Sequence, residues 1–214
     1  MRFRIDLKIF LISAIFCITN QIHIYMLTMV FALIHELGHL FAGILLKMKP
    51  EKIEIIPTGV AISFKLDVKQ INKKIYKGNM LDIKKILVAL SGPITNLLII
   101  IITININVIE KQNIIYANLL ILIFNLIPIY PLDGGRIIKG VFNIMFGKKQ
   151  TIKNIRFLSV INFIILTLVG IILLISNCNF AIIVILAYIW VLVIKEYKVF
   201  KQKEKIYKIL EENY

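Results

Sequence analysis

The sequence predicts an all-α polytopic membrane protein with about six transmembrane helices and a small β-hairpin segment between the second and third. Three observations support this prediction. Hydrophobic residues make up 59% of the 214 residues, well above the share in a soluble domain. They occur in long runs, close to the ~20 residues that a helix needs to cross a bilayer. The lysines and arginines lie almost entirely in alternate loops, as the positive-inside rule requires.

The membrane topology follows from the positions of the runs and of the basic residues. The six predicted spans are 7–22, 25–46, 84–107, 113–131, 156–176 and 179–197. With both termini in the cytoplasm, 25 of the 26 lysines and arginines lie in four cytoplasmic segments, namely 1–8, 47–85, 132–156 and 195–214. Membrane orientation, with some attraction to anionic lipid, therefore explains the net charge of +14 better than nucleic-acid binding does. We expect an integral multi-pass protein of a bacterial cell membrane, in contact with the lipid bilayer and with no nucleic acid.

The first predicted span is expected to stay in the mature protein. Arg2, Arg4 and Lys8 followed by an apolar run resemble a signal peptide, but no small-residue cleavage site follows. Cys17 and Cys178 lie far apart in or beside apolar segments. They predict neither a disulfide framework nor a cysteine zinc site.

The second predicted span carries the strongest chemical signal, His35-Glu36-Leu37-Gly38-His39. On a helix, His35 and His39 are four residues apart and leave the same face, so both imidazoles can bind one metal ion. Glu36 leaves a neighbouring strip, from which it can act as a general base on a water molecule without being a ligand. No other side chain between positions 26 and 46 is ionisable. Because ionisable groups at bilayer depth are costly, this cluster indicates a functional site.

Residues 47–83 are the one substantial segment predicted outside the membrane. In the runs 53–55 and 60–64, apolar residues alternate with others, and Pro57-Thr58-Gly59 separates the two runs. This pattern is typical of a β-hairpin. Its edge could pair with an extended substrate segment, because the hairpin directly follows the helix of the two histidines. A small amphipathic hairpin resting on the membrane surface explains the alternation equally well.

The third predicted span contains Ser91-Gly92-Pro93-Ile94-Thr95-Asn96. Its small residues permit close approach of helices, its proline loosens the helix, and its asparagine offers an amide. Taken alone, this run is explained by ordinary packing of small residues.

The fourth predicted span ends in a broken helix, from Asn125 to Asp133. Pro128 and Pro131 disrupt the helix, and non-helical backbone at this depth survives only where it lines a cavity or is buried in protein. Asp133 then precedes two glycines, and Asp-Gly is a common turn dipeptide. Without the two histidines, a turn would be the preferred interpretation of Asp133. With them, a metal ligand is preferred, because catalytic zinc takes three protein ligands and keeps an open position.

Asp133 is the best third ligand that the sequence offers. His23 is twelve residues before His35, roughly 18 Å along a helix, and both cysteines are poorly placed. Asp67 and Asp82 belong to the basic segment outside the membrane. Two histidines, one carboxylate and an open position suit Zn²⁺ and hydrolysis. The later spans are apolar nearly throughout, and residues 195–214 mix Lys and Glu at the spacing of a short surface helix.

The motifs of spans two to four resemble those of one protein family. HELGH in an early span and a later Asn-x-x-Pro-x-x-Pro-Leu-Asp-Gly resemble the site-2 protease family (peptidase M50) of intramembrane zinc metalloproteases. The Ser-Gly-Pro-x-x-Asn run also matches that family, and the resemblance covers over half of the chain. It implies that His35, His39 and Asp133 bind zinc and that Glu36 is the catalytic base. It also implies that substrate is positioned by Asn125, Pro128 and Pro131.

Within that family, the six-span layout without a PDZ insertion is similar to the branch of stage IV sporulation protein FB. Members of that branch usually continue into a cytoplasmic CBS domain that senses nucleotide, and 214 residues leave no room for one. We therefore expect this branch without its C-terminal CBS domain, so that neither nucleotide regulation nor the exact role of the branch follows from the resemblance.

These inferences predict a transmembrane metalloprotease domain over 1–200, with 47–83 as a cytoplasmic insert and 201–214 as a short cytoplasmic tail. We expect one Zn²⁺ per chain and a site open towards the cytoplasm. The expected substrate is a membrane-associated protein, cleaved in or near the membrane. By resemblance, the process is regulated intramembrane proteolysis, with a sporulation sigma-factor precursor as one such substrate and regulatory membrane proteins as further partners.

Two other functions are less consistent with the sequence. A metal-handling membrane protein or transporter would need further ionisable groups along its spans, and the remaining spans lack them. A catalytically inactive membrane scaffold would not need an intact base beside a full set of ligands.

Overall fold

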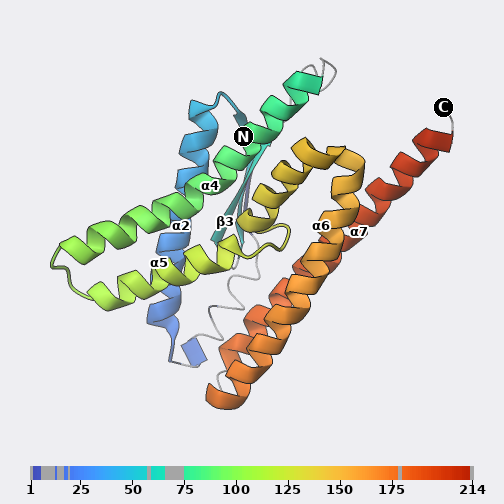
Figure 1. The fold of residues 1–214 in the computed structure, drawn as a ribbon. Coiled ribbons are helices and arrows are strands. Elements are labelled where there is room, and N and C mark those ends of the chain that lie inside the picture. The colour runs from blue at the N-terminus through green and yellow to red at the C-terminus, as the bar shows by residue number, and fades with distance from the viewer. Residues whose placement is uncertain are drawn as a thin grey trace. The chain divides into compact units, whose positions relative to one another are not determined.

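The structure is a computed structural model that describes residues 2–5, 20–56, 59–65, 75–177 and 180–212, together with positions 13, 17 and 18. The chain divides into two compact units, Met1–Asn125 and Leu126–Tyr214. The elements of the first unit are β1 (Arg2–Ile5), α2 (Ile22–Leu45), β2 (Lys49–Ile56), β3 (Gly59–Lys65), α4 (Ile75–Asn105) and α5 (Lys111–Leu126) (Figure 1). The second unit consists of α6 (Asp133–Asn177) and α7 (Phe180–Glu212).

A close contact between α2 and α4 organises the first unit. Gly38 of α2 lies so near Thr95 and Ser91 of α4 that a Cβ on Gly38 would collide with the Thr95 hydroxyl and lie 3.1 Å from the Ser91 carbonyl oxygen. This is the close approach that small residues permit between membrane helices. It brings the histidine-bearing face of α2 against the middle of α4. Helix α5 then runs back beside α4 (Figure 1).

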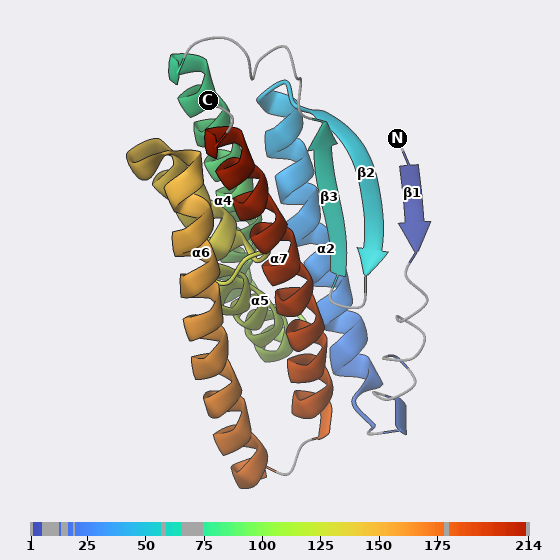
Figure 2. The ribbon, with the colours of Figure 1, turned by 90° about the vertical axis from the view of Figure 1, so that its right-hand side faces the viewer.

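A three-stranded sheet lies beside α2. Strands β2 and β3 pair antiparallel, from Ile56 opposite Gly59 to Lys49 opposite Lys65, with an irregularity between Pro50 and Lys52. These two strands occupy the segment for which the sequence predicts a hairpin. Strand β1 pairs parallel with β2, in the order β1-β2-β3, and β3 packs against α2 (Figure 2). The sequence analysis does not predict β1, because its partner lies about fifty residues along the chain and leaves no local pattern.

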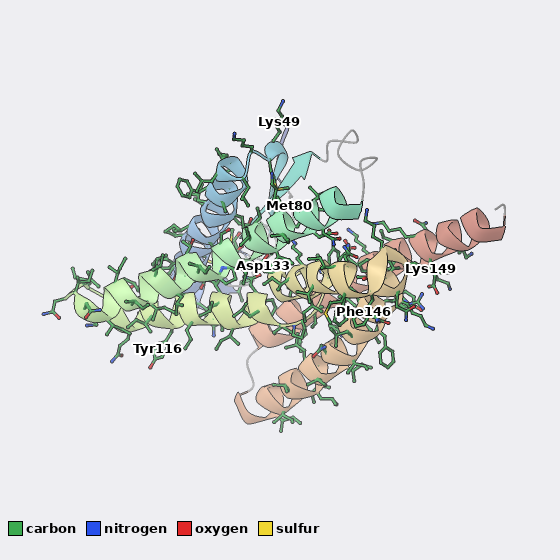
Figure 3. The ribbon with its side chains drawn as sticks, turned by 45° about the horizontal axis from the view of Figure 1, so that its top comes forward. Lys49, Met80, Tyr116, Asp133, Phe146 and Lys149 are labelled. Carbon is green, nitrogen blue, oxygen red and sulfur yellow. The ribbon has the colours of Figure 1, made fainter. Side chains whose placement is uncertain are left out.

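The second unit is built on a bend within α6. Gly147 has a φ of +76°, a left-handed conformation that glycine adopts without the steric cost of a Cβ. The helix therefore divides there into two arms, with Phe146 and Lys149 flanking the bend (Figures 1 and 3). Helix α7 packs along the second arm (Figure 2). Ile152, Ile155 and Phe200 form a buried hydrophobic cluster in this unit.

The observed helices correct several predicted boundaries. Helix α4 begins at Ile75 rather than at 84, and α7 continues to Glu212 rather than ending at 197 before a separate surface helix. Hydropathy marks only the apolar part of a helix, so polar extensions are missed. Helix α5 ends at Leu126 rather than at 131, because Pro128 and Pro131 cannot continue it. Asp133 begins α6 and does not close the preceding helix, as acidic residues are favoured in a first helical turn.

Some predicted features lie outside the described residues. These are most of the first span (7–22), the turn residues 57 and 58, the part of the 47–83 insert between 66 and 74, and the last two residues of the predicted tail.

Three of the described helices are long and apolar enough to cross a membrane, namely Ile22–Leu45, Asn79–Asn105 and Asp133–Ile172. Large apolar side chains such as Phe41, Ile102 and Ile172 are exposed on them, as lipid-facing residues are. These helices support the prediction that the chain is a membrane protein. The predicted number of six spans is not confirmed. At 16 residues, α5 is shorter than the ~20 residues usual for a span.

Candidate metal centre

His35 and His39 come together on the buried face of α2. Each is only 2% exposed, and their Nε2 atoms are 3.1 Å apart. Their rings meet edge to face, with centroids 4.7 Å apart. The predicted pairing of two imidazoles on one helical face is therefore present, and it faces α4.

The other nitrogen of each ring is held by an oxygen acceptor on α4. His39 Nδ1 lies 2.6 Å from the Val88 carbonyl oxygen and 3.3 Å from the Gly92 backbone nitrogen. The carbonyl makes the much shorter contact and can only accept, so we assign the proton to this nitrogen. His35 Nδ1 lies 2.5 Å from Asn96 Oδ1, also an acceptor. In the neutral imidazole, a proton on Nδ1 leaves the lone pair on Nε2. Both histidines thus present Nε2 as a potential ligand atom.

Gly92 of α4 lies so close to these two nitrogens that no side chain fits there. A Cβ on Gly92 would lie 2.5 Å from His39 Nε2 and 2.6 Å from His35 Nε2. Two lone pairs that face each other at 3.1 Å repel, and a cation between them removes the repulsion. The arrangement fits a metal ion such as zinc, whose histidine ligands usually donate their other ring N–H to an oxygen acceptor.

Glu36 and His23 differ in their relation to this pair. Glu36 follows His35 on α2 and is half-buried, on the strip beside the two histidines. His23 lies in the first turn of the same helix, where its Nε2 is 3.4 Å from a Glu110 carboxylate oxygen and both side chains are largely exposed. His23 thus pairs with Glu110 at the start of the helix.

Asp133 occupies the first residue of α6 in the second unit (Figure 3). It is 3% exposed, and its Oδ1 lies 3.5 Å from Arg136 Nη1. The two following glycines allow the helix start to lie directly on the preceding backbone. A Cβ on Gly135 would come within 2.5 Å of the Ile129 carbonyl carbon and the Tyr130 nitrogen. The two glycines are thus required by this tight contact.

The segment between α5 and α6 contains the two prolines predicted to position substrate. Pro128 and Pro131 are half-buried in non-helical backbone, which is held to α6 by a 3.0 Å hydrogen bond from the Tyr130 N–H to Ser159 Oγ. In the first unit, the half-buried Asn125 donates from Nδ2 to the Ile121 carbonyl oxygen at 3.0 Å.

Comparison with known proteins adds three findings. Residues 111–169 match the sequence profile of "Peptidase family M50". A curated zinc metalloprotease of Methanocaldococcus jannaschii is 27% identical over 139 residues, which cover 61% of this chain and 37% of that protein. The solved structure of a site-2 protease from Methanocaldococcus jannaschii superposes with a TM-score of 0.63 at 22% identity, over 95% of this chain and 92% of that one. This structural likeness shows the fold.

Residues 111–169 thus resemble peptidase family M50, and the fold resembles that of a site-2 protease. The matched profile begins at the start of α5 and includes the 125–133 motif. The HELGH motif on α2 lies outside the matched profile.

Sequence reasoning about this chain missed several residues that surround the histidines. Asn96 was noted only as part of a packing motif, and Asn118 of α5 was not singled out, although it accepts a 2.9 Å hydrogen bond from Asn96. Gly92 was noted for helix packing and not for its closeness to the Nε2 atoms. Ser159 was not noticed at all. Polar residues within apolar spans were the available signal for both asparagines.

Proposed function

We propose that this chain is an intramembrane zinc metalloendopeptidase that cleaves a membrane-associated protein. The observation that carries the proposal is the buried His35–His39 pair, whose Nδ1 atoms are bound to acceptors and whose Nε2 atoms lie 3.1 Å apart. The likeness to peptidase family M50 supports the same activity.

We propose that His35, His39 and Asp133 hold one Zn²⁺ per chain. Two imidazoles, one carboxylate and an open position form a recurrent donor set of catalytic zinc. A carboxylate as deeply buried as that of Asp133 needs hydrogen bonds or a nearby cation to remain an anion. Arg136, at 3.5 Å, is one such partner, and zinc would be the second.

The reaction divides among the side chains of this chain. When bound, zinc activates water at neutral pH and polarises the scissile carbonyl. Glu36 accepts the proton of the attacking water and passes it to the leaving amine. His35 and His39, held through their Nδ1 atoms, keep their orientation throughout. Burial of the pair limits the water that can reach it, which strengthens electrostatic interactions there.

The substrate is proposed to bind as an extended segment. β3 ends the three-stranded sheet on one side and packs against α2, so a substrate strand added to its edge would run near the histidine helix. We assign Asn125, Pro128 and Pro131 to positioning this segment. A local extended conformation would expose the substrate backbone for attack.

We further propose that both termini and the opening of the site lie on the cytoplasmic side of a bacterial membrane, as the distribution of Lys and Arg favours. Labelling of single cysteines placed in the 47–85 and 132–156 segments tests this orientation. Assignment to the sporulation branch, with a sigma-factor precursor as substrate and regulatory membrane proteins as partners, also stays a prediction. Co-expression with such a precursor tests it by the appearance of a shortened product.

The first experiment is the zinc content of the detergent-purified chain, beside Asp133→Ala and His39→Ala. We expect about one zinc per chain in the unaltered protein and its loss or marked weakening in both variants. Full zinc content in Asp133→Ala would mean that another residue is the third ligand. Glu36→Gln should keep its zinc and lose cleavage of a membrane-associated substrate, and retained cleavage would contradict the role of Glu36 as base.

A further inference from the structure

We infer that Asn118 of α5 is a positioning residue for the metal site, acting on His35 through Asn96. The inference deepens the proposed function and rests on it, because the orientation of His35 matters for catalysis only if His35 binds zinc. The three residues come from three helices of the first unit and form one continuous chain of hydrogen bonds. Both asparagines are 0% exposed, so their amide groups must find their partners within the protein.

The direction of every hydrogen bond in this chain follows from its far end. The Ile114 carbonyl oxygen can only accept, and it lies 2.9 Å from Asn118 Nδ2. Asn118 therefore presents its Oδ1 to Asn96, which donates from Nδ2 over 2.9 Å. Asn96 in turn presents its Oδ1 to His35 Nδ1, at 2.5 Å. A carbonyl oxygen of α5 thus determines that His35 carries its proton on Nδ1 and its lone pair on Nε2.

Reversing an amide breaks the chain. If Asn118 were turned over, its Oδ1 would face the Ile114 carbonyl oxygen and its NH₂ would face the NH₂ of Asn96. Two acceptors would then oppose each other, as would two donors, in a region without solvent access, where unmade hydrogen bonds are costly. One arrangement alone satisfies all the groups, and it selects the tautomer of His35 that suits a metal ligand.

The two histidines differ in how their tautomers are determined. His39 is held directly by the Val88 carbonyl oxygen, a backbone group that no side-chain substitution removes. His35 depends on two side chains in succession. Asn118 should therefore affect His35 and leave His39 unchanged, which ordinary helix-to-helix bonding by asparagine does not predict.

The test begins with the metal-free, full-length protein in detergent, labelled with ¹⁵N-histidine. The chain has only three histidines, and a His23→Gln background leaves the two of interest. Ring ¹⁵N spectra at a pH where both imidazoles are neutral distinguish the Nδ1–H and Nε2–H tautomers. We expect Nδ1–H for both residues in the unaltered protein. Asn118→Leu should convert His35 to a mixture while His39 stays Nδ1–H, because a leucine cannot orient the Asn96 amide.

Zinc affinity, measured by competition with a chelator, gives the second reading. Loss of a partner outside the ligand set usually weakens metal binding 10- to 100-fold, so we expect that range for Asn96→Leu and about tenfold for Asn118→Leu. In the Asn96→Leu background, Asn118→Leu should not weaken zinc binding any further. Thr103→Val is the matched control. Thr103 is buried in α4 and bonds to the Ile99 carbonyl oxygen at 2.7 Å, without a link to either histidine.

The outcomes separate this inference from the proposed function. An unchanged His35 tautomer with unchanged zinc affinity in Asn118→Leu overturns the inference, as does an additive effect in the double variant. Asn118→Ser, which is shorter but still polar, provides the same comparison if the leucine variant does not fold. If the unaltered protein binds no zinc, the proposed function fails, while the tautomer spectra still decide whether Asn118 orients His35.

Discussion

Gly92→Ala is the sharpest test of the geometry at the two histidines. The added Cβ would lie 2.5 Å from His39 Nε2 and 2.6 Å from His35 Nε2, whereas ordinary van der Waals contact begins at 3.4 Å. Relief requires a displacement of about 0.9 Å, the difference between 3.4 and 2.5 Å. Zinc–nitrogen distances are ~2.0–2.1 Å and vary by only about 0.2 Å. The displacement therefore exceeds that tolerance several-fold.

We expect Gly92→Ala to weaken zinc binding by at least about 100-fold, the upper end of the loss seen when an outer partner is removed, because both ligand atoms are displaced at once. Overpacking of a core site also costs about 1–3 kcal/mol of folding free energy. Chelator competition measures the affinity, and thermal unfolding of the metal-free protein measures the stability separately.

Gly170→Ala provides the control for added bulk. Its Cβ would meet the end of the Leu186 side chain, which can move aside, so zinc affinity should stay unchanged. Near-normal zinc affinity in Gly92→Ala would show that the metal does not occupy the space between the Nε2 atoms, and would refute the geometry assigned here.

Four further predictions concern other parts of the chain. Gly135→Ala should destabilise the protein by about 1–3 kcal/mol and reduce zinc content, since its Cβ would meet backbone atoms at 2.5 Å; an unchanged melting temperature would argue against this contact. Ser159→Ala should cost about 1 kcal/mol in thermal unfolding by removing the partner of the Tyr130 N–H, and equal stability would mean that water replaces it. His23→Gln should leave zinc content unaltered, because His23 is paired with Glu110 on an exposed surface; lost zinc would reopen its role as ligand. Removal of zinc by a chelator should abolish proteolysis and added zinc should restore it, whereas proteolysis without metal would exclude the proposed mechanism.

The local geometry of the histidine pair was predictable from the sequence. A four-residue spacing on a helix places His35 and His39 on one face whatever surrounds them, and the structure places their Nε2 atoms 3.1 Å apart. Disruption of the helix by Pro128 and Pro131 was likewise implied by the loss of a backbone donor at each proline, although the predicted span ran to 131 and α5 ends at Leu126. The sequence also indicated Asp133 as a candidate ligand, but it did not indicate that Asp133 begins α6.

The sequence by itself therefore determined the apolar helices, the basic segments between them and the ligand-like residues, because these depend on composition and on spacing along one element. Tertiary structure decided which groups orient those residues. Val88 and Asn96 lie 49 and 61 positions from the histidines they contact, and β1 pairs with a strand about fifty residues away. By itself, an asparagine such as Asn118 in an apolar helix indicates only ordinary helix packing. Its partner on α4, and hence its effect on His35, depends on long-range packing, which leaves no periodic pattern in the chain.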